Sequence, residues 1–252
     1  MHPNGELLTR NDGPVRTLTF GHPAHNSIPS PLLAEMAGAL DEAGRDDSVR
    51  VVLLRSAGDR TFCAGANFDE LLRLENETQA RRFFMGFANV ILAMRRCPKP
   101  VVVTVQGKAV GGGVGIASAA DYCLATEHAS IRLSELSIAI GPFVILPAVT
   151  RKLGTAAAAE LSIGTEWHRA KWAHARGLYQ HVYEGQQSMM AAAGQLCEKL
   201  AGYSREATAE LKRTLWFGTD HWPELLEERA GVSGRLVLGA EARQALATFK
   251  KK

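Results

Sequence analysis

The sequence has little net charge and no long hydrophobic run. Its 29 Lys and Arg residues against 26 Asp and Glu residues leave a formal net charge of +3 at pH 7, which is too weak to indicate a nucleic-acid partner. The longest apolar stretches, Pro100–Val105 and Ile138–Val149, are far shorter than the roughly 18 residues that a membrane-spanning helix requires. The polar N-terminus lacks the apolar segment of a signal peptide. We therefore expect a cytoplasmic protein with no membrane and no specific nucleic-acid partner.

Cysteine is scarce, and the motifs of several enzyme classes are missing. The four cysteines form no C-x-x-C pair and have no companion histidine at ligand spacing, so we expect free thiols and no metal site. The sequence lacks the H-E-x-x-H motif of zinc hydrolases, the G-x-S-x-G elbow of serine hydrolases and the P-loop. The segment Gly113–Ser118 nearly matches the dinucleotide fingerprint but has serine in place of the third glycine. We therefore expect no nucleotide cofactor.

The N-terminal half of the sequence alternates between strand and helix patterns. Val15–Phe20, Arg50–Ser56 and Pro100–Val105 are typical of strands, and the last two are typical of strands buried on both faces. Glycine and then helical periodicity follow each of these two runs, which favours parallel βαβ pairing. From about Pro147 onward the pattern is helical. The sequence thus predicts an α/β fold with a helical C-terminal region.

Glycine is the one residue in excess, at 24 of 252 residues against about 7% in an average protein. Two glycine-bearing segments, Thr61–Leu71 and Gly107–Gly115, follow the strands predicted at Arg50–Ser56 and Pro100–Val105. Ligands of open α/β sheets bind at the carboxyl ends of strands, and a helix start offers unpaired N–H donors. One N–H group from each segment, aimed at one oxygen, would form an oxyanion hole. Tight turns and close helix packing are the alternative interpretation.

Glu135 is the carboxylate most typical of a catalytic acid or base. It lies in Ser130–Leu136, after a short predicted strand at Tyr122–Thr126, and the apolar Ile138–Ile140 follows it. Burial among apolar neighbours raises the pKa of a carboxyl group, as a general acid or base at neutral pH requires. A helix-starting or surface glutamate is the alternative.

Together these segments resemble the crotonase, or enoyl-CoA hydratase/isomerase, superfamily. Within it, the segments Glu135–Leu153, Glu166-Trp167 and Ala173–Tyr179 look like bacterial enoyl-CoA and methylglutaconyl-CoA hydratase-like members. The resemblance rests on Phe62–Phe68, Ala109–Gly113, Ala120-Asp121 and Ser134–Leu136, with weaker support from His22–Ile28. It implies a ββα spiral core over residues 1–200 and a helical oligomerisation region over residues 201–252, assembled as a homotrimer or hexamer. It also implies an acyl-CoA thioester substrate and no cofactor beyond the coenzyme A that this substrate carries.

The resemblance also assigns roles to single residues. Ala66 and Gly112 match the positions whose backbone N–H groups hold the thioester oxygen. Glu135 matches the catalytic acid/base. Ala24, Ala64 and Phe68 match positions along the coenzyme A groove.

Two positions depart from the hydratases that use two glutamates. Those enzymes carry a first acid at the position of Gly115, twenty residues before Glu135, so we expect Gly115 to border the substrate without supplying an acid. Phe143 stands where those enzymes tend to have a glycine-rich turn, and there it would fill space beside the substrate. A short or branched acyl group is therefore favoured.

The sequence predicts an enzyme that stabilises a thioester enolate, and four interpretations stay open. Hydration or dehydration of a short or branched enoyl-CoA is narrowly ahead of Δ3-Δ2-enoyl-CoA isomerisation by one glutamate. A non-catalytic protein that binds coenzyme A thioesters is a further alternative, because an acid is missing at Gly115. Nonspecific nucleic-acid binding is the last, through the basic runs Arg81-Arg82, Arg95-Arg96 and Lys250–Lys252, although such runs are usually solvated faces.

Overall fold

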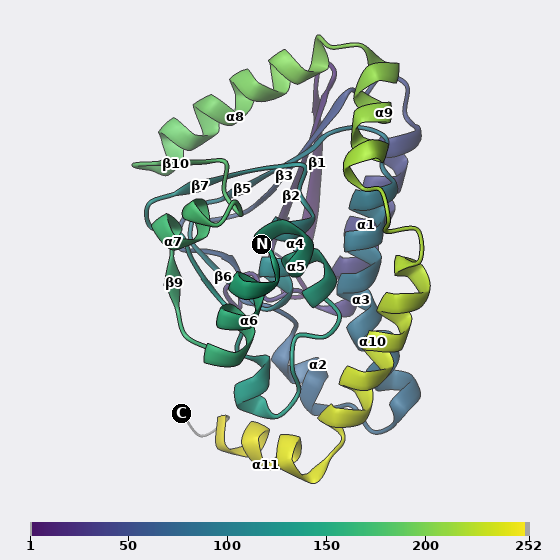
Figure 1. The fold of residues 1–252 in the computed structure, drawn as a ribbon, viewed down its shortest axis with the longest axis vertical. Coiled ribbons are helices and arrows are strands. Elements are labelled where there is room, and N and C mark those ends of the chain that lie inside the picture. The colour runs from purple at the N-terminus through teal and green to yellow at the C-terminus, as the bar shows by residue number, and fades with distance from the viewer. Residues whose placement is uncertain (1, 250–252) are drawn as a thin grey trace.

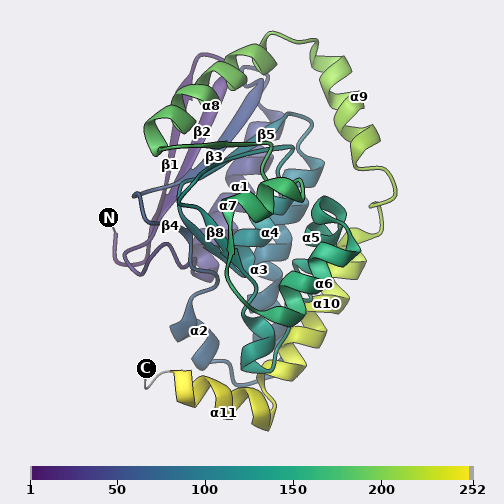
Figure 2. The same cartoon turned by 60° about the vertical axis from the view of Figure 1, so that its left-hand side comes forward.

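The computed structural model describes residues 2–249 and contains two β-sheets surrounded by helices (Figure 1 and Figure 2). The larger sheet has six strands in the order β1-β2-β3-β5-β7-β10. They are Glu6–Asp12 (β1), Val15–Gly21 (β2), Val51–Ser56 (β3), Val101–Val105 (β5), Tyr122–Thr126 (β7) and His181–Tyr183 (β10). β1 and β2 are antiparallel, and the other neighbouring pairs are parallel. The strands predicted from the sequence are confirmed to within one residue at each end.

Helices cover both faces of this large sheet because successive side chains of each strand point to opposite sides. Val52 and Leu54 of β3 belong to the main core, together with residues of α1 (Ser30–Arg45) and α3 (Glu77–Arg96). Val51 and Leu53 of the same strand pack instead with residues of α8 (Gln186–Ala201). All five residues of β5 are buried. The inner strands β3 and β5 are therefore closed to solvent on both sides, as the apolar runs predict, whereas the edge strand β1 is mostly exposed.

The second sheet is small and has the order β4-β6-β8-β9. Its strands are Thr61–Cys63 (β4), Lys108–Val110 (β6), Ser130–Arg132 (β8) and His168–Arg169 (β9). β4, β6 and β8 are parallel, and β9 is antiparallel to β8. The two glycine segments and the segment of Glu135 each contain one of these parallel strands. The sequence patterns did not predict this sheet, because two or three residues are too few to show a period.

The remaining helices complete the fold. They are α2 (Phe68–Leu72), α4 (Gly112–Ala119), the 3-10 helix η1 (Glu135–Ile138), α5 (Leu146–Leu153), α6 (Thr155–Gly164), α7 (Ala170–Ala175), α9 (Arg205–Leu215), α10 (Trp222–Val237) and α11 (Ala240–Phe249). Over residues 2–249, no helix combines the length and the hydropathy needed to cross a membrane.

The C-terminal helices pack on their own chain. α10 runs along α3, and α11 contacts η1 (Figure 1). Val237, Ala242 and Leu246 share an apolar cluster with residues of α2 and α3. The division at residue 200 and an oligomerisation role for the region after it stay predictions. Of the basic runs singled out above, Lys250–Lys252 lies outside the described residues.

Candidate active site

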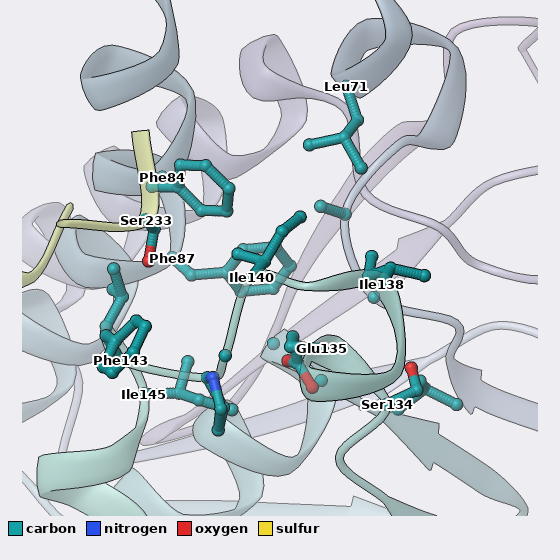
Figure 3. A pocket seen from close by; sticks show the side chains of 18 of the residues that line it. Leu71, Phe84, Phe87, Ser134, Glu135, Ile138, Ile140, Phe143, Ile145 and Ser233 are labelled. Atoms are coloured by element: carbon teal, nitrogen blue, oxygen red, sulfur yellow. The ribbon is translucent and has the colours of Figure 1, made fainter. Parts of the chain in front are cut away.

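A cavity of about 310 Å³ lies where the carboxyl ends of β4, β6 and β8 meet (Figure 3). Its size is at the lower end of the range for pockets that bind small ligands. Its walls come from the three strand ends, α2, α3, η1, the loop after η1, the residue before β9, and α10. No described residue of the large sheet lines it.

The turn after β4 presents the N–H group of Ala66. Gly65 adopts a φ of +93°, which a glycine tolerates without strain. Its carbonyl accepts a hydrogen bond from the N–H of Ile28 at 2.8 Å, and the N–H of Asn67 donates to the carbonyl of Ile28 at 3.3 Å. These two bonds fix the turn on either side of Ala66, whose own N–H group donates to no described residue.

The second donor, the N–H group of Gly112, lies at the start of α4. Gly112 is the first residue of the helix, so its N–H group has no carbonyl one turn earlier in the helix to which it could donate. Space requires glycine here, because a Cβ atom at Gly112 would lie 2.2 Å from the ring of Phe87. A Cβ atom at Gly113 would likewise lie 2.6 Å from Cβ of Cys63, the last residue of β4. This close contact brings the start of α4 against the end of β4, so the two donors border the same cavity.

The carboxyl group of Glu135 lies against the backbone at the entry to α4 (Figure 3). A Cβ atom at Gly111 would lie 2.7 Å from Oε1 of Glu135, and Gly111 has a φ of +52°. Both the lack of space and the backbone conformation therefore require glycine at this position. Oε2 is buried without a hydrogen bond to any described residue. Burial raises the pKa of Glu135 to about 7, and hydrogen bonds from its own N–H and that of Ser134 oppose the rise. The prediction of a raised pKa is confirmed.

The other predicted site residues divide into two groups. Ala64, Phe68 and Phe143 line the cavity with Ala66, Gly112 and Glu135. Ala24 and Gly115 do not line it. Ala24 is exposed, in a turn that the Asn26 side chain ties to the carbonyls of Ala57 and Thr61.

Gly115 is buried inside α4 because Ile145 packs against it. A Cβ atom at Gly115 would lie 2.5 Å from Cγ2 of Ile145 and 3.4 Å from Cδ1 of Ile91. Ile145 itself lines the cavity. A glutamate at position 115 would therefore need Ile145 to move, so the chain lacks both the first acid and the space for one.

Several lining residues were not predicted. Phe83, Phe84 and Phe87 on α3, Trp167 before β9 and Ser233 on α10 all border the cavity. On a helix, apolar residues at such spacing indicate a buried face without telling whether a core or a cavity lies against it. Nothing in the sequence near Ser233 distinguishes it from an ordinary helical serine.

The comparisons with known proteins identify the family. The family model described as enoyl-CoA hydratase/isomerase matches residues 10–250. The chain belongs to the enoyl-CoA hydratase/isomerase family. A short-chain-enoyl-CoA hydratase of Clostridium acetobutylicum is 30% identical over 188 residues, which cover 74% of this chain and 72% of the relative. A trans-2-decenoyl-[acyl-carrier-protein] isomerase of Streptococcus mutans is also 30% identical, over 184 residues that cover 71% and 70%.

Solved structures agree on the fold. The crystal structure of an enoyl-CoA hydratase from Bacillus halodurans superposes with a TM-score of 0.89 and covers 96% of this chain and 99% of its own. At 19% identity this likeness shows the fold alone. The predicted family, the crotonase-like α/β fold and the enzyme class are thus confirmed. Identity does not separate the reactions, because a relative named as a hydratase and one named as an isomerase are equally similar to this chain.

Proposed function

We propose that this enzyme moves a proton at carbon 2 of an enoyl-CoA thioester. Glu135 is the acid/base, and the N–H groups of Ala66 and Gly112 form the oxyanion hole. The observation that supports this most is one cavity bordered by two unpaired N–H donors and by a carboxyl group whose Oε2 has no hydrogen bond. Donors that are held in place before the charge develops stabilise an enolate oxygen without reorganisation.

The reaction that this arrangement favours is the shift of a double bond from carbons 3 and 4 to carbons 2 and 3. The carboxylate of Glu135 removes a proton from carbon 2, and the electron pair moves into an enolate. The negative enolate oxygen accepts hydrogen bonds from the N–H groups of Ala66 and Gly112. The carboxyl group then returns the proton to carbon 4, and the enolate collapses to the 2-enoyl thioester. One base is sufficient, and no water takes part. A pKa of about 7 suits a group that takes and gives a proton at neutral pH.

The lining residues favour this one-base reaction over hydration. Glu135 is the one acidic residue among the described residues that line the cavity, and Ile145 fills the space beside Gly115. Hydration requires one group to activate water and one group to deliver a proton to carbon 2, and two carboxyl groups perform these two tasks readily. From the sequence alone, hydration was narrowly favoured over isomerisation. This proposal therefore places isomerisation first.

Hydration or dehydration is the second candidate. The relative from Clostridium acetobutylicum is named as a hydratase, and a single carboxyl group with a pKa near 7 has both protonation states available in turn. In either reaction, Phe143 and Ile145 take up part of the cavity, which supports a short or branched acyl group.

The proposed assembly is the homotrimer or hexamer that the resemblance implies. Leu211, Leu215 and Phe217, on α9 and directly after it, are 60%, 59% and 89% exposed. Apolar side chains exposed together in this way support an interface with a second copy. Sedimentation equilibrium would test it, and a monomer at micromolar concentration would contradict it.

Purified enzyme incubated separately with 3-hexenoyl-CoA and crotonyl-CoA distinguishes the candidates. Formation of 2-hexenoyl-CoA with no hydration of crotonyl-CoA is the result we expect. Hydration of crotonyl-CoA without turnover of 3-hexenoyl-CoA would replace our first candidate by the second. Coenzyme A binding without turnover of either substrate would indicate a non-catalytic thioester-binding protein.

A further inference from the structure

Ser233 places a polar group in the part of the cavity away from Glu135. It belongs to α10, lines the cavity and is 1% exposed. Figure 3 shows it on the side of Phe84 and Phe143, whereas Glu135 and Ser134 lie on the other side. Its hydroxyl group makes no hydrogen bond to any residue that the structure describes. The hydroxyl group is open to the cavity, so a ligand that fills the cavity shields it from water, and a shielded hydroxyl group without a hydrogen bond is costly.

Helix packing fixes the position of this serine but does not explain its hydroxyl group. A Cβ atom at the neighbouring Gly234 would lie 3.1 Å from the backbone nitrogen of Arg81 and 3.3 Å from Ala80, so α10 is held close against α3. The small side chain of Ser233 suits this approach, yet alanine would suit it equally and has a higher helix propensity. The hydroxyl group is thus left without a structural partner, and it borders a cavity.

We propose that Ser233 determines acyl specificity by hydrogen-bonding a neutral oxygen, a hydroxyl or ketone, on the distal part of the acyl chain. This inference rests on the proposed function, because it takes the ligand to be an acyl-CoA. A serine hydroxyl both donates and accepts, so it pairs with either group. A site that hydrogen-bonds a substrate oxygen discriminates against the chain that lacks it, because the buried serine would then stay unpaired.

The charges around the cavity exclude a carboxylate from this position. Arg132 is the one cation among the described lining residues. Its Nε donates to the carbonyl of Thr165 at 2.6 Å, and its guanidinium lies 6.0 Å from the ring centre of Trp167. Phe84, Phe143 and Ile145 offer no positive charge, and a carboxylate buried beside them would lack a counter-ion.

The test measures the binding of saturated acyl-CoA thioesters, which have no double bond to react. Isothermal titration calorimetry compares hexanoyl-CoA with its 4-, 5- and 6-hydroxy and 5-oxo analogues and with adipoyl-CoA, which ends in a carboxylate. We expect at least one neutral oxygenated analogue to bind about 3- to 10-fold more tightly than hexanoyl-CoA. Ser233→Ala should lower that ratio to about 1, partly because hexanoyl-CoA then no longer leaves a hydroxyl group unpaired and binds more tightly. Adipoyl-CoA should bind less tightly than hexanoyl-CoA.

Ser118→Ala is the matched control, because Ser118 is fully buried with an unbonded hydroxyl group and does not line the cavity. It should keep the wild-type ratio. The proposal is overturned if no oxygenated analogue binds more tightly than hexanoyl-CoA, if Ser233→Ala keeps the ratio, or if adipoyl-CoA binds most tightly. Failure of the proposed function has a different signature, in which the binding ratio persists but no enoyl-CoA is turned over. If none of these thioesters binds, both proposals fall.

Discussion

The two sheets of this protein are built from similar parallel strands but differ in what they do. The inner strands of the six-stranded sheet are covered on both faces, and none of the sheet's described residues lines the cavity. The four-stranded sheet has strands of two or three residues, yet Ala66, Gly112 and Glu135 all follow directly from its parallel strands. The large sheet holds the molecule together, whereas the small one brings three chain segments to a common edge.

The difference shows how little regular structure a site requires when its backbone is fixed in other ways. Ile28 holds the turn of Ala66 by two hydrogen bonds, and Gly113 lets α4 lie directly on Cys63. Residues on the large sheet should therefore affect stability, and residues at the ends of the small sheet should affect catalysis. The following experiments test that division, from the largest expected effect to the smallest.

Glu135→Gln removes the proposed proton carrier and should lower kcat by about 10³-fold, within the usual range for a general acid or base. The fold should survive, because the amide needs no burial of charge. Steady-state kinetics with 3-hexenoyl-CoA measures kcat, and the urea midpoint of the variant shows whether the fold survives. A kcat within threefold of wild type would contradict the assignment of Glu135.

Leu54→Ala tests the large sheet. Leu54 is fully buried in β3, and such a truncation costs about 2–5 kcal/mol of unfolding free energy. We expect this loss in urea denaturation, with kcat per folded molecule unchanged. A tenfold loss of kcat in a folded variant would break the division between the sheets.

Gly115→Ala tests whether the space beside Gly115 is filled. Its Cβ atom would lie 2.5 Å from Cγ2 of Ile145, and overpacking of this kind costs about 1–3 kcal/mol. In an Ile145→Ala background the contact with Cγ2 is removed, whereas the contact with Cβ at 2.7 Å remains. The same substitution should therefore cost less in that background without becoming free of strain. A double-mutant cycle from urea unfolding gives the coupling energy. Additive effects would show that Ile145 does not occupy this space.

The pH dependence gives the smallest effect. In the proposed reaction the carboxylate is the active form of Glu135, whose pKa is about 7. The kcat/KM for 3-hexenoyl-CoA should therefore rise about tenfold from pH 6 to well above pH 7. A profile flat between pH 6 and 8 would contradict the raised pKa.

The same pKa should appear in stability with the opposite trend. The pKa of Glu135 is higher in the folded than in the unfolded state, so folding binds a proton between these two values. The stability of the wild type relative to Glu135→Gln should therefore fall as the pH rises from about 4.5 to about 7, and then level off. Urea midpoints of both proteins across this range measure the difference, and a constant difference would contradict it.

Long elements and local chemistry could be predicted from this sequence, whereas contacts between distant segments could not. The apolar run at Pro100–Val105 predicted a buried strand, and every residue of β5 is indeed buried. The prediction succeeded because a strand that is covered on both faces has apolar residues throughout. The raised pKa of Glu135 was also predicted, although its carboxyl group lies against the distant Gly111 and the neighbouring Leu136 is 50% exposed. Ser233 gave no signal, since only the packing of α10 on α3 brings it to the cavity.

The sequence by itself determined the family and indicated two glycine segments and Glu135 as the candidate site, because motifs and their order along the chain carry that information. Only the tertiary structure decided which sheet these segments belong to, since strands of two or three residues have no readable period. It also decided the meaning of the glycines. Gly111 makes room for a carboxyl group and Gly112 for an aromatic ring, whereas Gly115 makes room for Ile145, which fills the space of a second acid. A missing side chain becomes interpretable only when the atoms that would meet it are known.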